Sequence, residues 1–283
     1  MHMFSNRKGM KRNERGHQLF TLACALLIFC GSAAAQLFLP PPPPEQPSDF
    51  GKVVLDNYAS KPGSPGAVVF DHWLHRSKFT CRLCHVDIGF AMSAKATGIT
   101  AESNRQGFHC GTCHDGKRLV ESKPVFAACS NSPADAQCNR CHSVGKYGAR
   151  KYEYNSFTAK FPKAMMYGVD WPAAETKGMI KPIDVMEGVT FRKDQIQGRE
   201  DFGIKAGVSW VNPVLFSHEK HSIWNGCELC HPEIFPTVKK SDVQYTMYSN
   251  VHGRHCGACH LKVAFPLNNC QQCHARAPAW AQR

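Results

Sequence analysis

The sequence has little long-range apolar order. After one apolar run from Leu19 to Cys30, no second hydrophobic span follows, and neither strand-like alternation nor a heptad pattern is sustained. These absences argue against a multi-span membrane protein and against a coiled coil. Acidic residues are also scarce, 22 against 34 Lys and Arg, which gives a formal net charge of +12. Taken alone, such a charge would favour an anionic partner such as a nucleic acid.

The N-terminal segment has the features of an export signal. Five basic residues precede the apolar run and small residues from Gly31 to Ala35 follow it. We expect cleavage after Ala35, so residues 1–35 are a predicted signal peptide and the protein is predicted to be periplasmic or extracellular. The run is too short for a comfortable transmembrane helix, and no transmembrane segment is expected after cleavage. Lipid attachment at Cys30 and an uncleaved anchor are the alternatives.

Cysteine and histidine are abundant and regularly spaced. The chain has 15 of each, and Cys-x-x-Cys-His occurs six times. This spacing is the attachment signature of haem c, in which two thiols bond to the vinyl groups of one haem and the next His binds its iron. The predicted attachment residues are Cys81, Cys84, Cys110, Cys113, Cys138, Cys141, Cys227, Cys230, Cys256, Cys259, Cys270 and Cys273. The predicted proximal ligands are His85, His114, His142, His231, His260 and His274. We therefore expect six covalently bound haem c groups.

Two other uses of paired cysteines fit the pattern less well. Zinc ribbons and disulfide frameworks also contain Cys-x-x-Cys. Neither needs a His directly after each second Cys, yet all six motifs have one. Outside the motifs, Cys24 and Cys30 leave with the signal peptide and Cys129 is left over. We expect Cys129 to be partly buried and to have no role. The alternatives are an intermolecular disulfide, which would allow self-association, and a local redox role.

Haem attachment changes the meaning of the net charge. Residues 1–35 carry five Lys or Arg and one Glu, a net +4, so the mature chain keeps +8. Each haem adds two propionates, which the ferric core offsets only in part, so six haems cancel most of this excess. No nucleic-acid partner is expected.

The chain repeats internally. The first two motifs recur after 146 residues and the third after 132, so the second copy is 14 residues shorter before its last motif. A Phe-x-His-x-x-His segment precedes each copy at Phe70–His75 and Phe216–His221, again 146 residues apart, and Asp-Phe-Gly begins each copy at Asp49 and Asp201. The predicted organisation is a proline-rich spacer at 36–48, a three-haem module at 49–150, a connecting segment at 151–200 and a second three-haem module at 201–283.

Histidines outside the motifs supply enough distal iron ligands. His2 and His17 leave with the signal peptide, and seven others are not proximal. The predicted distal ligands are His72, His75, His109, His218, His221, His252 and His255. The repeat matches the first three to His218, His221 and His255. Because Gln106 stands opposite His252, the third distal ligand stays open: His252 competes with His255, and Met92 and Met247 are outside alternatives. Two imidazoles on each iron would leave no open site and would give low-potential haems.

The order of Phe-x-His-x-x-His, five residues and three Cys-x-x-Cys-His motifs resembles the c7-type trihaem cytochromes, relatives of the tetrahaem c3 cytochromes. The chain resembles a tandem pair of such modules over roughly residues 68–142 and 214–274. The resemblance implies a c3/c7-like multihaem fold with low regular secondary structure, short helices, a little β-hairpin and two haem-packed modules. It also implies that His72 and His218 bind the first haem of their copies, and that the second His of each pair binds a neighbouring haem. The family's third distal His lies four residues before the second motif, where His252 stands.

Each module is too small to bury a self-sufficient apolar core, so haems are expected to replace it. Between the modules, Tyr147 to Glu200 contains neither Cys nor His. Asp170 before Pro172, with Gly178 as a stop, predicts one short helix there. The segment is expected to pack against haem edges, and a partner-binding surface is the alternative.

These features predict an electron carrier rather than an enzyme. We expect it to pass electrons through closely packed bis-His haems to other redox proteins of an anaerobic respiratory chain. A reductase of a small oxyanion such as nitrite is one alternative, but it needs an open iron, and the histidine count disfavours that. A haem-bearing subunit of a larger membrane complex, or a filament, is the other alternative.

Overall fold

The computed structural model describes residues 47–57, 66–130, 137–142, 147–164, 168–191, 200–236, 245–267 and 269–275. The predicted signal peptide and all but the last two residues of the predicted spacer lie outside these ranges. The described residues all belong to one compact unit, residues 44–283. No helix in these ranges is long and apolar enough to cross a membrane.

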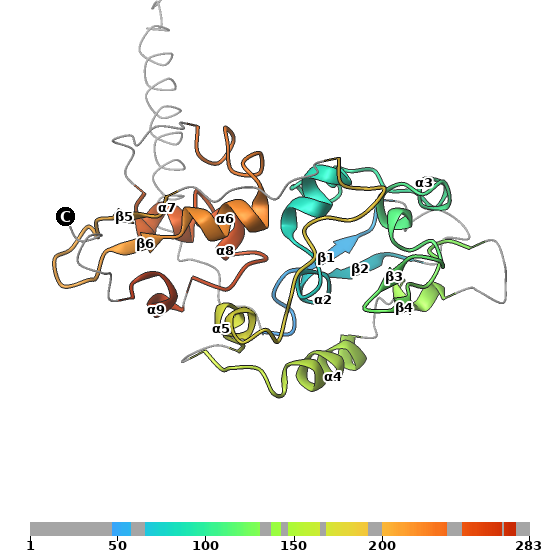
Figure 1. The fold of residues 1–283 in the computed structure, drawn as a ribbon, viewed down its shortest axis with the longest axis horizontal. Helices are drawn as coiled ribbons and strands as arrows, with labels where there is room; N and C mark the ends of the chain where they lie inside the picture. The colour runs from blue at the N-terminus through green and yellow to red at the C-terminus, as the bar shows by residue number, and fades with distance from the viewer. Residues whose placement is uncertain are drawn as a thin grey trace, which may run out of the picture. The chain divides into compact units, whose positions relative to one another are not determined.

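Regular structure is sparse and its elements are short, as the sequence predicts (Figure 1). The described strands are β1 (Lys52–Leu55), β2 (Val68–Asp71), β3 (Leu119–Val120), β4 (Lys123–Pro124), β5 (Phe202–Ile204) and β6 (Val214–Phe216). The described α-helices are α2 (His72–Arg76), α3 (Ala101–Arg105), α4 (Tyr147–Thr158), α5 (Trp171–Thr176), α6 (His218–Asn225), α7 (Met247–Val251), α8 (Gly257–His260) and α9 (Cys270–Cys273). A π-helical turn, η1 (Leu83–Asp87), and two 3-10 turns, η2 (His109–Thr112) and η4 (Cys138–Arg140), complete the described elements.

Two antiparallel hairpins lead into the helices that carry the Phe-x-His-x-x-His histidines. In the first copy β1 pairs with β2, and β2 runs directly into α2. In the second copy β5 pairs with β6, and α6 follows after Ser217, whose side chain caps the helix at Lys220. The β-branched and aromatic residues of β2 and β6 favour strands. Both expected hairpins are therefore present, and β3–β4 is a third that the sequence analysis did not predict.

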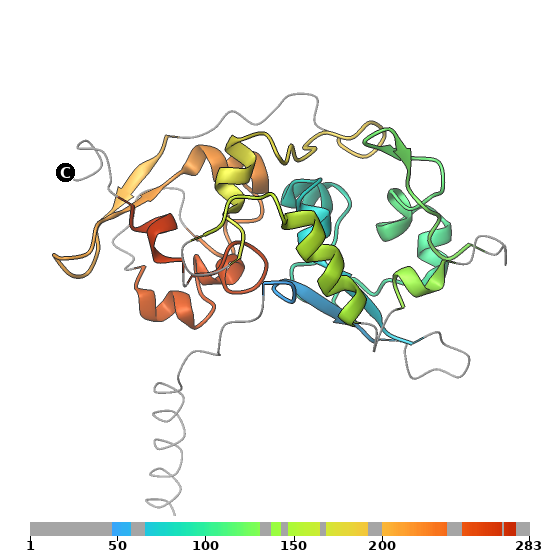
Figure 2. The same cartoon turned by 90° about the horizontal axis from the view of Figure 1, so that it is seen from below.

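The connecting segment contains two helices where the sequence analysis predicted one. The predicted helix is α5: Asp170 accepts a hydrogen bond from the backbone N–H of Ala173 at 3.0 Å, and Pro172 lies in the first turn. The additional helix is α4, the yellow-green helix in Figure 2. It begins at Tyr147 and therefore crosses the predicted module boundary at residue 150. Its signal was the aromatic spacing of Tyr154, Phe157 and Phe161, which matches one helical face.

The largest described apolar cluster joins α2 to this connecting segment. Trp73 of α2 is only 2% exposed and packs edge-on against Tyr154 of α4, with ring centroids 5.2 Å apart. Phe161, Val169, Ala174 and Ile180 complete the cluster. The connecting segment thus supplies most of the buried apolar residues that pack on the first copy, in place of a core within the module.

A buried ion-pair network attaches the connecting segment to the first motif. Arg82 is 3% exposed, and its guanidinium lies 2.6 Å from Asp87 and 3.1 Å from Asp184. Burial alone would lower the pKa of Arg82, but the hydrogen bonds and charges of the two carboxylates outweigh it and raise that pKa. Arg82 and Asp184 are 102 residues apart, so their contact attaches the connecting segment to the first Cys-x-x-Cys-His.

Candidate haem-binding site

The motifs form single helical turns that put their three functional side chains on one side. In five of the six motifs the His backbone N–H donates to the carbonyl of the first Cys at 2.7–2.9 Å. In a helical turn, positions i, i+3 and i+4 share a face. Both thiols and the imidazole therefore face the same space, as attachment of one porphyrin requires.

Backbone carbonyls hold the proximal imidazoles by Nδ1. In five of the six motifs the carbonyl oxygen lies 2.6–2.9 Å from that nitrogen. The pairs are His85 with Phe90, His142 with Gly66, His231 with Phe235, His260 with Phe265 and His274 with Asn212. Because a carbonyl can only accept, Nδ1 must carry the proton and Nε2 keeps its lone pair. This arrangement orients Nε2 as a metal ligand.

The same restraint is found on most of the other histidines. Nδ1 lies 2.6 Å from the Gly51 carbonyl in His72, 2.7 Å from the Ser217 carbonyl in His221, and 2.7 Å from the Tyr248 carbonyl in His252. In His75 the corresponding distance, to Asp71, is longer at 3.3 Å. These histidines are held in the manner of the proximal ones.

His109 and His255 are held differently. Nδ1 of His109 lies 3.4 Å from the Ser103 hydroxyl, and Nδ1 of His255 is buried with no hydrogen-bond partner among the described residues. Both residues have positive φ, 51° and 48°, and stand directly before a motif. Their rings lie beside Phe90 and Phe235, at centroid distances of 5.7 and 5.9 Å. They therefore lie next to the first motif of their copy, without the carbonyl restraint.

One imidazole pair occurs at matching positions in both copies. The ring centroids of His75 and His114 are 6.3 Å apart, with an interplanar angle of 55°. Those of His221 and His260 are 6.2 Å apart, at 57°. Two imidazoles on one iron need roughly 6 Å, since each metal–nitrogen bond is about 2 Å and each ring centre lies about 1 Å beyond its nitrogen. The spacing of each pair fits one iron between the rings.

The Phe of Phe-x-His-x-x-His stacks on the second His in both copies. Phe70 lies 4.4 Å from His75, and Phe216 lies 4.4 Å from His221, between ring centroids. The stacking restricts rotation of these two imidazoles. The order of residues in the segment thus has a direct structural reason: the aromatic ring supports the His five positions later.

The surroundings of the motifs favour uncharged thiols and imidazoles. Burial raises the pKa of Cys81 to about 11 and that of Cys110 to about 12. Burial also lowers the pKa of His72 and of His260 to about 4. Iron ligation requires neutral imidazole, and an apolar macrocycle suits such dry surroundings. The residues present therefore fit haem c.

The middle motif of each copy packs against a short capped helix. Thr100 caps α3 by accepting from Ser103 N–H at 3.0 Å, and Thr246 caps α7 in the same way at 3.1 Å. A Cβ at Gly111 would lie 1.8 Å from the backbone oxygen of Asn104. At the matching Gly257 it would lie 1.8 Å from the backbone oxygen of Asn250. Only glycine fits at the second position of the middle motif.

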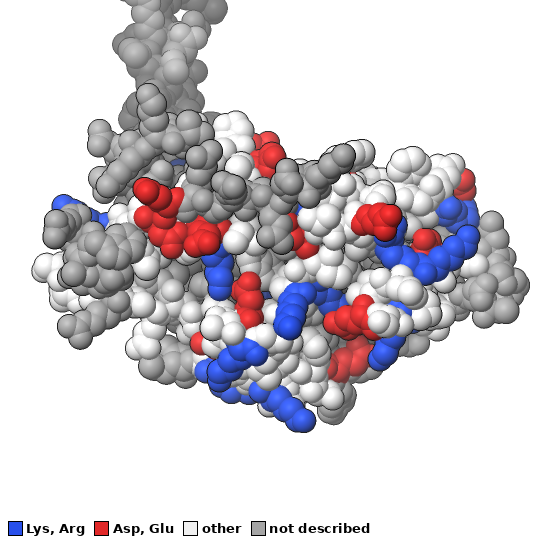
Figure 3. Space-filling model, in the orientation of Figure 1, with Lys and Arg blue, Asp and Glu red and all other residues white. Residues whose placement is uncertain are grey.

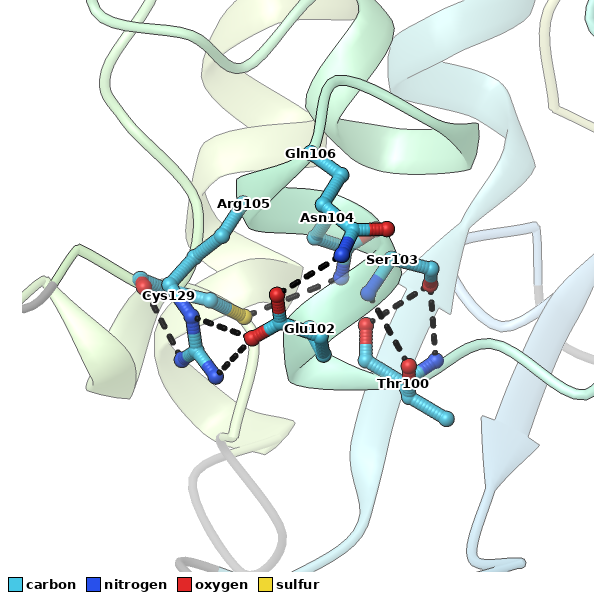
Figure 4. A network of polar contacts seen from close by, with 7 residues as sticks. All are labelled: Thr100, Glu102, Ser103, Asn104, Arg105, Gln106 and Cys129. Atoms are coloured by element: carbon cyan, nitrogen blue, oxygen red, sulfur yellow. Dashed lines mark hydrogen bonds and ion pairs between the residues drawn. The ribbon is translucent and has the colours of Figure 1, made fainter.

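The end of this helix is where the copies diverge. In the first copy the Gln106 amide donates to Glu102 at 2.8 Å, and Glu102 also pairs with Arg105 (Figure 4). In the second copy His252 stands at the matching position. Cys129 belongs to the first-copy network, where its partly buried Sγ accepts from the Asn104 amide at 3.7 Å (Figure 4). The 14-residue stretch absent from the second copy thus supports α3.

Charge on the surface is mixed. Acidic and basic side chains are interspersed on the face shown in Figure 3, without a continuous basic patch there.

Known proteins were compared with the chain. The sequence model of the family described as cytochrome c7 and related cytochrome c matches residues 68–143 and 214–275, which together contain all six motifs. The fold is c7-like. The chain is a multihaem c-type cytochrome.

Among solved structures, the chain is similar to the C-terminal hexahaem fragment of GSU1996. The two are 21% identical over 83% of this chain and 99% of that one, with a TM-score of 0.24. The N-terminal hexahaem fragment is 22% identical over 80% and 98%, with a TM-score of 0.24. Dodecahaem cytochrome c GSU1996 is 22% identical over 81% and 76%, also with a TM-score of 0.24. No curated protein matches the chain.

Proposed function

We propose that the chain is an exported electron carrier with six haem c groups, each bound by two histidines. The observation that carries this proposal is the repeated imidazole pair, His75 with His114 and His221 with His260, at 6.3 and 6.2 Å. Two independent copies of one spacing, each fitting one iron, favour iron ligation over incidental packing.

The ligand assignment follows from the imidazole pairs, from the resemblance to the c7-type cytochromes and, for His252, from the restraint on Nδ1. We assign His75 and His221 to the irons of the middle motifs of their copies. His72 and His218 are assigned to the first motifs, as the resemblance to the c7-type cytochromes implies. In the second copy we assign His252, rather than His255, to the third motif, because only His252 has the carbonyl restraint.

Bound haem supplies one-electron chemistry. The chain's own residues attach it through paired thiols, orient Nε2 through backbone carbonyls and exclude water around the motifs. Filled axial positions leave no substrate site, which favours a carrier over an enzyme. The proposed partners are other redox proteins of a respiratory chain, and the proposed location is periplasmic or extracellular, as the predicted signal peptide implies.

A reductase is the second candidate, and one observation favours it. Gln106 occupies the position of His252 and its amide is bound to Glu102, while His109 lacks a carbonyl restraint. The third haem of the first copy is therefore the site where an open iron would occur. Small-oxyanion reduction needs such an iron.

Two measurements on the mature holoprotein test the proposal. Intact mass should show six haems per chain, and a carbon monoxide titration of the reduced protein should show no binding at any of them. Fewer than six haems would contradict the attachment assignment. Carbon monoxide binding at two or more haems would contradict the carrier assignment, and binding at one alone would favour the reductase.

A further inference from the structure

Arg76 is a charged side chain that haem attachment and ligation do not explain. It ends α2, directly after His75, and the matching residue of the second copy is Ser222. Among the described residues, no Asp or Glu forms an ion pair with it. Arg76 is partly buried, and its Nε is fully buried. A charge partly withdrawn from water without a counter-charge is costly, so a partner outside the described protein atoms is indicated.

Three separate parts of the chain meet at the Arg76 guanidinium. Its carbon lies 4.6 Å from the ring centre of Trp171, the first residue of α5. One Nη donates to the backbone carbonyl of Val263, three residues after the fifth motif. Nε is buried and has no hydrogen-bond partner among the described residues. The guanidinium is thus held by Trp171 and Val263, while its Nε–H has no acceptor among the described residues.

The first and fifth motifs lie close together at this point. A Cβ on Gly51, whose carbonyl holds His72, would lie 3.4 Å from the Lys262 oxygen and 3.5 Å from Val263 Cα. Burial chiefly raises the pKa of Cys81, and the next contribution comes from the Cys259 thiol of the fifth motif. The first motif of one copy therefore adjoins the middle motif of the other.

Arg76 lies near histidines of both copies. Val263, whose carbonyl accepts from Arg76, stands three residues after His260 and close to Gly51, whose carbonyl holds His72. Ser222 offers no such charge, and its hydroxyl is used within α6, donating to backbone carbonyls. The electrostatic environment of the two copies therefore differs at one matched position.

We propose that Arg76 binds a haem propionate at this junction and raises the reduction potentials of the haems at Cys81/Cys84 and Cys256/Cys259. A guanidinium fork matches a carboxylate, and the buried Nε is a donor available for it. A nearby positive charge disfavours the oxidised haem, which carries one more positive charge than the reduced form. The inference rests on the proposed haem attachment. In it, Arg76 positions a haem propionate where the first motif of one copy adjoins the middle motif of the other.

The test is a redox titration of the full holoprotein carrying Arg76→Gln, followed through the haem methyl resonances. Haem content by mass is measured first, so that loss of a haem is distinguished from a change in potential. We expect the reduction potentials of the haems of the first and fifth motifs to become more negative by about 59 mV. This corresponds to a tenfold change in the equilibrium constant of a one-electron couple. Arg76→Lys keeps the charge and should shift less than half as far.

Arg105→Gln is the matched control. Arg105 is exposed and paired with Glu102, so removing it changes the net charge equally at a screened site. Equal curves for Arg76→Gln and Arg105→Gln, with all haems attached, would overturn the inference and leave the proposed function intact. A shift in Arg76→Lys as large as in Arg76→Gln would overturn the role of the charge.

The unmodified protein supplies a second test that does not depend on the variant taking up haem. The haem at Cys81/Cys84 should titrate at a higher potential than its repeat counterpart at Cys227/Cys230. The reverse order would contradict the inference.

Discussion

The two copies agree in the spacing of one imidazole pair and differ where the chain contacts the connecting segment and where Gln106 stands opposite His252. His75 with His114 and His221 with His260 have the same spacing within 0.1 Å, 6.3 against 6.2 Å, and the same stacked Phe. By contrast, Arg76 and Arg82 of the first copy are replaced by Ser222 and Glu228 in the second. The repeat thus preserves the geometry of this imidazole pair, whereas the copy-specific residues attach the connecting segment and join the copies.

The largest expected effect comes from filling the space that both copies keep for glycine. Gly111→Ala and Gly257→Ala each place a Cβ 1.8 Å from a backbone oxygen, so the capped helix must move away from the motif. We expect each to destabilise its copy by about 3 kcal/mol and to reduce haem attachment at the middle motif. Denaturant unfolding and intact mass measure this.

Gly253→Ala is an unsuitable control because the φ of Gly253 is +82°. The Cβ of Gly207→Ala meets nothing within 4 Å, so this control should have a mild effect on stability. Full stability of both motif variants would mean that this packing is absent from both copies.

The next effect should be confined to the first copy. Asp184→Ala removes one of two carboxylates from the buried Arg82, and we expect a loss of about 2 kcal/mol in the free energy of unfolding. Asp184→Asn keeps an oxygen for the Thr80 and Arg82 donors and should lose less. Glu228→Gln, at the position matching Arg82, is the control from the second copy. A loss as large in that control would show that the network is not specific to the first copy.

A smaller effect should separate the two candidate ligands of the second copy. His252→Ala should convert one haem from low-spin to high-spin, because we propose His252, whose Nδ1 faces the Tyr248 carbonyl, as the third distal ligand. His255→Ala should leave all haems low-spin. Electron paramagnetic resonance of the oxidised variants distinguishes them, and a high-spin haem only in His255→Ala would reverse the assignment.

The smallest effect is expected at Cys129. Its contact with the Asn104 amide is long, 3.7 Å, and the first copy has other supports for α3. Cys129→Ser should change the free energy of unfolding by less than about 1 kcal/mol and leave the oligomeric state unchanged. Sedimentation under oxidising conditions would show a lost dimer if Cys129 joined two chains.

Local patterns predicted much of the structure, and long-range contacts account for the rest. The hairpins before α2 and α6 and the cap of α5 follow from short stretches of sequence, because turn residues, β-branched runs and an Asp before Pro act locally. The core on Trp73 and the Arg82–Asp184 pair join residues 81 to 107 positions apart. No spacing rule links such partners, so the attachment of the connecting segment was missed. The sequence analysis also missed α4, although the spacing of Tyr154 and Phe157 was a local signal for it.

The candidate site shows the same division. The motif turns and the stacking of Phe70 on His75 follow from the order of the residues. The choice between His252 and His255 does not, because both precede the same motif; the difference lies in whether a carbonyl, that of Tyr248, faces Nδ1. Arg76 was overlooked for a related reason, since its position gains meaning only where Val263 and Trp171 approach it.

The most direct measurement is the electron paramagnetic resonance spectrum of the oxidised holoproteins carrying His75→Ala and His221→Ala. If each of these histidines shares an iron with its partner, each variant retains its haems and gains one high-spin signal, which added imidazole returns to low-spin. If both spectra stay entirely low-spin and match that of the unmodified protein, neither histidine is an iron ligand. The repeated imidazole pair would then be packing, and the account of two copies sharing one ligand geometry would be wrong.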